Sequence, residues 1–515
     1  MTTGAELVIE TARSLDLDVC FANPGTTELP LVHALDRVGG VRAVLGLHEN
    51  VCTGAADGYA RLAGKPALTL LHLGPGLANG LANLHNARRA FSPVVNLIGE
   101  HASWHLSADP PLAADIEALA GVVSRWTRRC VSAGACGRDM AEALAAVTSG
   151  RGSIATLILP HDVQTAAAGD AAPAVVRPRG YPAVDTDAVA RAARLLAGAE
   201  APAVLLGGSG LHGSGLEAAG RLGVTLIAEV SFARLETGRG RPPLRRLPYF
   251  PEQAQALLDQ FDAIVVAGTR LPVSFFGYDD KPSRYLEDRD DVVLLADQEE
   301  DAASALTALA AEMGAKRAAP DSGEHPDEGA FAGSSAGLDA DTIARVTTAR
   351  LPEDAVAVVT AVSSSAAFYE HSRGAAPHTQ IALTGGAIGE GSALSLGAGV
   401  ACPGRRVVAL EADGSGAYIV QALYGHAREN LDVTTVICAN QRYRILEIEL
   451  ERAGMRRPGS NATDLADLSR PALDWVSLAR GFGVPGTRVT TAGELDAALA
   501  RSLETAGPYL IEAVF

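Results

Sequence analysis

Two stretches near the C-terminus decide the fold class: Glu411-Ala412-Asp413-Gly414-Ser415-Gly416 and Cys438-Ala439-Asn440-Gln441-Arg442-Tyr443. Each follows an apolar, β-rich run, at residues 406–410 and 433–438, and the residues between them, 417–430, have a helical pattern. This order predicts two neighbouring parallel strands, with Asp413 and Asn440 just past their carboxyl ends, where open α/β sheets bind ligands. A carboxylate, a side-chain amide and a nearby carbonyl suit a hard cation such as Mg²⁺, with phosphate oxygens completing its coordination.

The rest of the chain repeats this alternation of β-branched runs and Ala- and Leu-rich helical runs. Residues 165–185, rich in Ala, Pro and Gly, and residues 318–337, with few large apolar side chains, interrupt it. We interpret both as surface linkers, which divide the chain into segments 1–170, 183–315 and 338–515. The expected fold is therefore α/β, with three domains that are each a mostly parallel sheet flanked by helices.

The composition excludes several classes of function. A net charge of −17 argues against a nucleic-acid partner, because phosphate contacts need a basic surface. No run of about 18 apolar residues is present, so no membrane span is expected, and the N-terminus lacks the pattern of a signal peptide. The six cysteines are scattered, without C-x-x-C spacing, as expected for buried thiols of a cytoplasmic protein.

The first two stretches resemble the signature of enzymes that depend on thiamine diphosphate (ThDP), Gly-Asp-Gly-Ser followed at this distance by Asn-Asn. Ala412 and Ala439 depart from that signature, but both ligand positions are kept. Further motifs of the family follow in order over nearly the whole chain, at residues 23–30, 47–49, 56–61, 74–76 and 384–389. The chain is similar to ThDP-dependent 2-oxo acid decarboxylases and carboligases, especially acetolactate-synthase-like proteins and benzoylformate decarboxylase.

The resemblance implies a metal site and a diphosphate site in the third segment. Asp413, Asn440 and the backbone carbonyl of Arg442 would bind Mg²⁺. Gly414 and Ser415 would bring backbone amides and a helix N-terminus toward the diphosphate.

The same resemblance implies further cofactor contacts from Ser363, Ser364, Gly386 and Ile388. Tyr443 is expected to contact the cofactor as well and to help cover the substrate. Ser363 and Ser364 stand where family members place hydroxyls against the diphosphate, although a plain helix cap is the alternative. Gly386 lies in a strand-to-helix loop that permits close backbone approach. Ile388 would be the apolar wedge that bends the cofactor, unless it is only a core residue.

In the first segment, Glu49 follows a short strand at residues 42–47. The resemblance implies that its carboxyl group bonds to N1′ of the aminopyrimidine and so promotes removal of the C2 proton. Without that context, Glu49 would be an ordinary acid in the first turn of a helix.

Three further residues of the first segment are candidates for the site. His72, after the strand at residues 67–71, would bond to the substrate carboxylate or relay protons, with a core histidine as the alternative. Asn79 would lie beside the cofactor. Thr26 stands where benzoylformate decarboxylase carries a substrate-binding hydroxyl, although a turn residue there is also compatible with the sequence.

The middle segment contains a possible dinucleotide fingerprint, Gly208-Ser-Gly210-Leu-His-Gly213, with Glu229 ending the next strand. In this family the middle domain is Rossmann-like. Acetolactate synthases bind FAD there and many decarboxylases bind nothing; because this segment is short, FAD is not expected. Phe276 stands where benzoylformate decarboxylase has a second catalytic histidine, which argues against that activity and indicates a more apolar pocket.

The expected function is therefore ThDP- and Mg²⁺-dependent decarboxylation of a 2-oxo acid. Protonation would then give an aldehyde, or a second carbonyl compound would be ligated; the sequence leaves this branch open. The alternatives are a benzoylformate-type simple decarboxylase, a catalytically silent ThDP-binding partner subunit, and a dinucleotide oxidoreductase. Because Glu49 and the metal ligands stand in domains that different subunits supply in this family, a homodimer is the expected minimum and a homotetramer is common.

Overall fold

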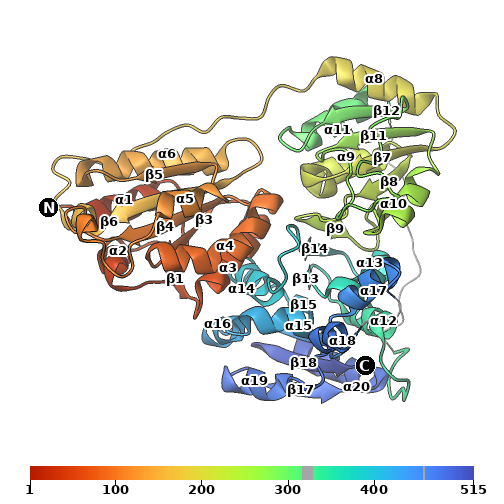
Figure 1. Ribbon diagram of the computed structural model, residues 1–515. Helices are drawn as coiled ribbons and strands as arrows, with labels where there is room; N and C mark the ends of the chain where they lie inside the picture. Colours follow the sequence, from red (N-terminus) through yellow and green to blue (C-terminus); the bar gives the residue numbers. More distant parts are fainter. Residues whose placement is uncertain (316–328, 456–458) are drawn as a thin grey trace.

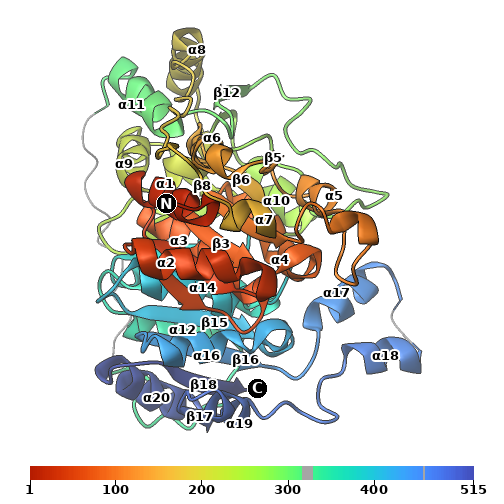
Figure 2. The same cartoon turned by 90° about the vertical axis from the view of Figure 1, so that its left-hand side faces the viewer.

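The computed structural model describes residues 1–315, 329–455 and 459–515, so part of the second predicted linker, residues 318–328, lies outside the described residues. It contains three β-sheets flanked by helices, as the sequence predicts. The middle and third sheets lie at opposite ends of the molecule, and the first sheet lies beside both (Figures 1 and 2).

The first sheet has six parallel strands in the order β2-β1-β3-β4-β6-β5. Its central strands are apolar runs buried on both faces, as is usual where helices cover both sides of a parallel sheet. The strands are β1 (Val19–Asn23), β2 (Arg42–Leu45), β3 (Ala67–Leu71), β4 (Val94–Glu100), β5 (Trp126–Arg129) and β6 (Ile154–Pro160). The helices are α1 (Gly4–Ser14), α2 (Leu29–Val38), α3 (Glu49–Ala63), α4 (Leu73–Ala90), α5 (Ile116–Gly121), α6 (Cys136–Thr148) and α7 (His161–Thr165).

The middle sheet has five parallel strands in the order β10-β8-β7-β11-β12. Its strands are β7 (Pro202–Leu206), β8 (Thr225–Ala228), β10 (Leu244–Arg246), β11 (Ala263–Ala267) and β12 (Val292–Ala296). Its helices are α8 (Thr186–Ala197), α9 (Gly213–Arg221), α10 (Pro251–Leu258) and α11 (Ala302–Glu312). Between α7 and α8 the described chain forms only an isolated bridge, Thr3 with Ala167, and runs extended to the middle sheet (Figure 1).

The third sheet has seven strands in the order β17-β18-β16-β15-β13-β14-β9, all parallel except the last pair. The edge strand β9 (Leu235–Thr237) comes from the middle segment. The other strands are β13 (Val356–Val359), β14 (His378–Ala382), β15 (Val407–Ala412), β16 (Val433–Ala439), β17 (Gly486–Val489) and β18 (Tyr509–Val514). The helices are α12 (Ala340–Arg350), α13 (Ala366–His371), α14 (Gly391–Ala401), α15 (Asp413–Gly416), α16 (Ala422–Arg428), α17 (Arg444–Arg452), α18 (Ser460–Ala466), α19 (Trp475–Gly481) and α20 (Ala492–Glu504).

Helices α3 and α14 join the first and third domains (Figure 1). They approach so closely at two glycines that a methyl group on Gly58 would lie 2.3 Å from the Leu394 carbonyl oxygen, and one on Gly397 would lie 2.0 Å from that of Ala55. Backbones come this near only where no Cβ separates them. This contact fixes the relative position of the two domains.

A buried ion pair strengthens the same junction. Arg61 on α3 donates to Asp57 (2.7 Å) and, across the junction, to the Ala382 carbonyl (2.6 Å) and the Thr384 hydroxyl (3.2 Å). Glu390 lies 3.8 Å from Arg61, and burial together with the nearby Asp57 raises the pKa of Glu390 well above its ordinary value. The closest charge pair at this junction is therefore Arg61 with Asp57.

Two expectations of the sequence analysis concerned membrane-spanning helices and the state of the cysteines. No helix within the described part of the chain is long and apolar enough to cross a membrane. All six cysteines lie in that part and are free thiols; five are buried and Cys402 is half-buried.

Candidate active site

The predicted cation ligands lie at adjacent strand ends. Strands β15 and β16 pair in parallel, Asp413 follows the first and Asn440 follows the second. The Asp413 carboxylate accepts hydrogen bonds from the Gln441 amide (2.6 Å) and the Gly414 amide (2.8 Å), so the two loops are directly connected. Asp413 is only 3% exposed, and burial raises its pKa. A buried carboxylate of this kind is stabilised when a cation binds to it.

The expected diphosphate loops close around this carboxylate. The Ser415 hydroxyl accepts a hydrogen bond from the Gly389 amide (2.9 Å), which ties the loop of Gly386 and Ile388 to α15. The ring of Tyr443 packs directly against Gly414. The Gly414 amide already donates to Asp413, so it is engaged within its own loop.

The hydroxyl cluster forms a 3-10 turn, η5 (Val362–Ser365), after β13. Ser364 is buried, and Ser363 is half-buried. Val362, a β-branched residue, has a φ of 47°, and Gln441 beside Asn440 has a φ of 56°. Such left-handed conformations of residues other than glycine cost free energy and concentrate at functional sites.

A second group of predicted residues gathers in the first domain. Glu49 begins α3 and is 8% exposed, and its carboxyl group accepts a hydrogen bond of 3.0 Å from the Asn79 side-chain amide. His72 ends the loop after β3, and Leu73, the next residue, has a φ of 53°. Leu73 is therefore one of three left-handed residues, with Val362 and Gln441, that lie beside predicted site residues.

Glu28 organises this half of the site, and the sequence reasoning gave it no role. Its fully buried carboxyl group lies 2.7 Å from His72 Nδ1 and accepts hydrogen bonds from the Gly25 amide (2.9 Å) and the Thr27 hydroxyl (2.8 Å). It thereby holds the loop carrying Thr26 against His72. Gly25 has no side chain to complete a capping box, so Glu28 three residues after it gave no distinctive signal in the sequence.

Comparison with known proteins fits both halves of the site. Residues 2–119 match the thiamine pyrophosphate enzyme N-terminal TPP binding domain, and residues 359–513 match the C-terminal TPP binding domain. The chain belongs to the thiamine pyrophosphate enzyme family. Thiamine pyrophosphate is another name for ThDP.

Relatives of this ThDP enzyme cover its whole length. A Mycobacterium tuberculosis protein named "Putative acetolactate synthase large subunit IlvX" is 46% identical, over 99% of this chain and 98% of its own. Benzoylformate decarboxylase of Pseudomonas aeruginosa is 28% identical, over 99% and 98%. The structure of a Rhodococcus jostii ThDP-dependent 4-hydroxybenzoylformate decarboxylase shares the fold, with a TM-score of 0.82, 24% identity, and coverage of 99% and 98%.

The residues present fit ThDP with a divalent cation. Within the described residues no group of three or more His, Cys, Asp or Glu side chains could hold a metal ion unaided. Asp413, the Asn440 oxygen and the carbonyl of Arg442 are hard oxygen donors, and they leave positions that a diphosphate can fill. The buried Glu49 carboxyl offers a partner for a ring nitrogen in the first domain.

The possible dinucleotide fingerprint is engaged by the protein itself. Arg151 of the first domain packs its guanidinium against Gly208 and donates to the Gly268 (3.3 Å) and Gln298 (3.2 Å) carbonyls. Glu229 accepts a hydrogen bond from the Thr269 hydroxyl (2.8 Å).

The loop after β11 reaches the loop of Gly386. The ring of Phe275 packs against Gly386. Phe276 follows it, stacks edge-on with Phe275 at 5.1 Å, and is 54% exposed. Two apolar rings therefore lie beside the loop of Gly386.

We expect Glu28→Gln to lower kcat/KM at least ten-fold with little change in ThDP affinity. The amide cannot match the carboxylate's contacts to both His72 and the Gly25 loop, so His72 loses its fixed orientation. Steady-state kinetics measure kcat/KM, and calorimetric titration measures the affinity for ThDP. The matched control is Glu312→Gln on the exposed face of α11, which should behave as wild type. An unchanged kcat/KM in Glu28→Gln would show that Glu28 does not position His72 for the reaction.

Proposed function

We propose that this enzyme, with ThDP and Mg²⁺ bound, decarboxylates a 2-oxo acid and can ligate the product to a second carbonyl compound. The observation that carries the proposal is the Asp413 carboxylate, buried at the end of β15 and joined to the Asn440 loop through the Gln441 amide. This is a site for a cation that holds phosphate oxygens. A 2-oxo acid as substrate agrees with the names of the relatives.

When bound, ThDP supplies the electron sink that loss of CO₂ from a 2-oxo acid requires. The protein's part is positioning and proton transfer. Glu49, held by Asn79, shares a proton with N1′ of the aminopyrimidine. His72, oriented by Glu28, donates a hydrogen bond to the substrate carboxylate. The hydroxyl of Thr26, in the loop that also carries Glu28, contacts the substrate.

The remaining cofactor contacts come from the third domain. Asp413, Asn440 and the Arg442 carbonyl bind Mg²⁺. The loops of Ser363, Ser364, Gly386, Gly414 and Ser415 surround the diphosphate, with Ile388 as the apolar support and Tyr443 as the cover.

The proposed assembly is a homodimer or homotetramer that functions in the cytoplasm. Glu49 and Asp413 lie in different domains, and both must contact the same cofactor. Pairing two copies supplies each cofactor with both domains, as the family resemblance implies.

The fate of the product depends on whether a proton donor or an acceptor carbonyl reaches it first. The ring of Phe275 packs against Gly386, Phe276 stacks edge-on with it, and neither side chain can donate a proton. This favours carboligation of the acetolactate-synthase type over simple decarboxylation of the benzoylformate type.

A panel of 2-oxo acids tests the proposal. Purified protein with added ThDP and Mg²⁺ is assayed for CO₂ release and product mass, with ThDP omitted as the control. We expect CO₂ release from at least one 2-oxo acid, together with an acyloin or acetohydroxy acid. ThDP binding without turnover of any panel member would instead indicate a catalytically silent partner subunit.

A further inference from the structure

The loop at residues 383–390 connects β14 to α14 and carries Gly386 and Ile388. It is irregular, and Gly386 and Gly389 in it have φ values of 80° and 93°. Because such a loop lacks the repeating backbone hydrogen bonds of a helix or a sheet, its position is set by the contacts that its polar groups make with neighbouring elements.

The first domain holds this loop through one residue of α4, Asn86. The side-chain NH₂ of Asn86 donates to the Ala387 carbonyl (2.8 Å), and its side-chain oxygen accepts a hydrogen bond from the Ala387 amide (3.2 Å). Asn86 therefore bonds to both backbone polar groups of the residue before Ile388, as a neighbouring strand would. Asn86 is fully buried, so water cannot replace these hydrogen bonds if the side chain is lost.

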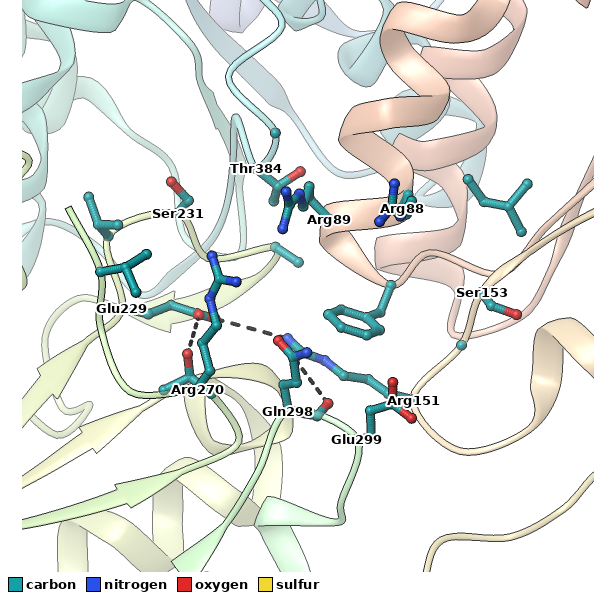
Figure 3. A pocket seen from close by; sticks show the side chains of 18 of the residues that line it. Arg88, Arg89, Arg151, Ser153, Glu229, Ser231, Arg270, Gln298, Glu299 and Thr384 are labelled. Atoms are coloured by element: carbon teal, nitrogen blue, oxygen red, sulfur yellow. Dashed lines mark hydrogen bonds and ion pairs between the residues drawn. The ribbon is translucent and has the colours of Figure 1, made fainter. Parts of the chain in front are cut away.

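Two further contacts join the loop to α4. The Thr384 hydroxyl donates to the Asn86 carbonyl (2.7 Å), and His85 Nε2 lies 3.0 Å from the Gly385 carbonyl oxygen. Figure 3 shows Thr384 beside the end of α4, where Arg89 is labelled. A methyl group on Gly385 would lie 2.5 Å from Asn86 Oδ1, so the loop and the helix are as close as a glycine allows.

A second buried asparagine braces Asn86 from within the first domain. Asn83 Oδ1 lies 3.4 Å from Asn86 Nδ2. Asn83 is itself fixed, because its side chain donates to the Asn50 carbonyl (2.8 Å) and its backbone amide donates to the Asn50 side chain (2.9 Å). Both ends of the Asn86 side-chain amide therefore have partners, which fixes its orientation.

These hydrogen bonds are not needed to join the first and third domains. Helices α3 and α14 already do so through the close contacts at Gly58 and Gly397. A buried amide pair adds little net free energy, but it specifies one geometry, because any other leaves polar groups unpaired. The position that Asn86 specifies is that of Ala387 and of the next residue, Ile388.

We propose that Asn86 is a positioning residue, which holds the loop of Ala387 so that Ile388 supports ThDP in the geometry that the reaction needs. The inference rests on the proposed function, in which Ile388 is the apolar support of the cofactor. Asn86 acts through Ile388 rather than on the reacting atoms. Small displacements of a group that orients reacting atoms have large effects on rate.

The test uses the full chain with ThDP and Mg²⁺ bound and requires no substrate. Hydrogen–deuterium exchange at C2 of bound ThDP reports how the cofactor is held for removal of its C2 proton. We expect Asn86→Ala to slow this exchange about ten-fold or more. The ThDP Kd, measured by calorimetry, should change by only a few-fold, because the proposed cation and diphosphate ligands are retained.

Asn96→Ala is the matched control, since it truncates another fully buried asparagine of the first domain. The Asn96 side chain bonds to Thr69 (2.7 Å) and Thr156 (3.1 Å) instead of the loop. Thermal unfolding should show a loss of stability in both asparagine variants, whereas C2 exchange should stay at the wild-type rate in Asn96→Ala. Equal slowing in the two variants would reveal a general structural effect and overturn the proposal.

His85→Ala provides a second variant in case Asn86→Ala does not fold. His85 is half-buried and makes one contact with the loop, so this variant should fold and slow C2 exchange by a smaller factor than Asn86→Ala. Wild-type exchange in the folded variants overturns the proposal and leaves the proposed function intact. If the wild-type protein itself neither bound ThDP nor exchanged its C2 proton, both would be overturned.

Discussion

Glu49→Gln should lower kcat/KM on the 2-oxo acid substrate by about 10³-fold, the scale of a lost general acid–base group. The Gln side chain keeps the size and the Asn79 contact of Glu49 but cannot give up a proton to N1′ of the aminopyrimidine. The ThDP Kd should change by only a few-fold, because the proposed cation and diphosphate contacts lie in the third domain. Steady-state kinetics measure kcat/KM, and calorimetry measures the ThDP Kd.

Two further measurements sharpen this prediction. Hydrogen–deuterium exchange at C2 of bound ThDP should slow in Glu49→Gln, since the proposed role concerns that proton. The control is Glu117→Gln, an exposed glutamate of the same domain, which should match wild type in all three measurements. Wild-type turnover by Glu49→Gln on the true substrate would refute the mechanism.

The second large effect is expected for Asp413→Asn, which should weaken Mg²⁺-dependent ThDP binding by about 100-fold or more. Asn has one acceptor oxygen, so the variant keeps the hydrogen bond from only one of the two amides, Gln441 or Gly414, and loses the negative charge of the site. Calorimetric ThDP titration at several Mg²⁺ concentrations measures the change. Removal of the cation from wild type with EDTA should cause a comparable loss.

Thermal unfolding separates a binding defect from a folding defect. Without ligands, Asp413→Asn should unfold close to the wild-type temperature, because it removes the cost of a buried carboxylate but leaves one backbone N–H without its acceptor. Asp464→Asn, an exposed aspartate of α18, is the control for charge removal in the same domain. If Asp413→Asn bound ThDP and Mg²⁺ with wild-type affinity, Asp413 would not be a metal ligand.

Much of the fold could be predicted because local patterns mark the strands. The strand at residues 67–71 matches β3, and the two strands before Asp413 and Asn440 pair in parallel. The predicted helix at 417–430 begins instead as a 3-10 turn, η7 (Ala417–Ile419), before α16, as often happens at helix ends. The edge strand β9 could not be predicted, because three residues are too few for a periodic signal and its partner, β14, is remote in sequence.

In the candidate site, too, some residues could be predicted from local patterns and others could not. Motif spacing indicated the residues at strand ends, such as Glu49 and Asp413. It could not indicate what their neighbours do: Glu28 is placed against His72 by packing between loops that are 44 positions apart.

The glycine contact between α3 and α14 has a consequence for how this enzyme can diversify. Since any side chain at Gly58 or Gly397 would strike the opposite backbone, substitutions there cannot adjust the seam gradually. New specificities should therefore arise mainly through the middle domain, whose loop at Phe275 reaches Gly386 from outside that seam. Laboratory evolution should accumulate its accepted changes in that loop and leave the two helices untouched.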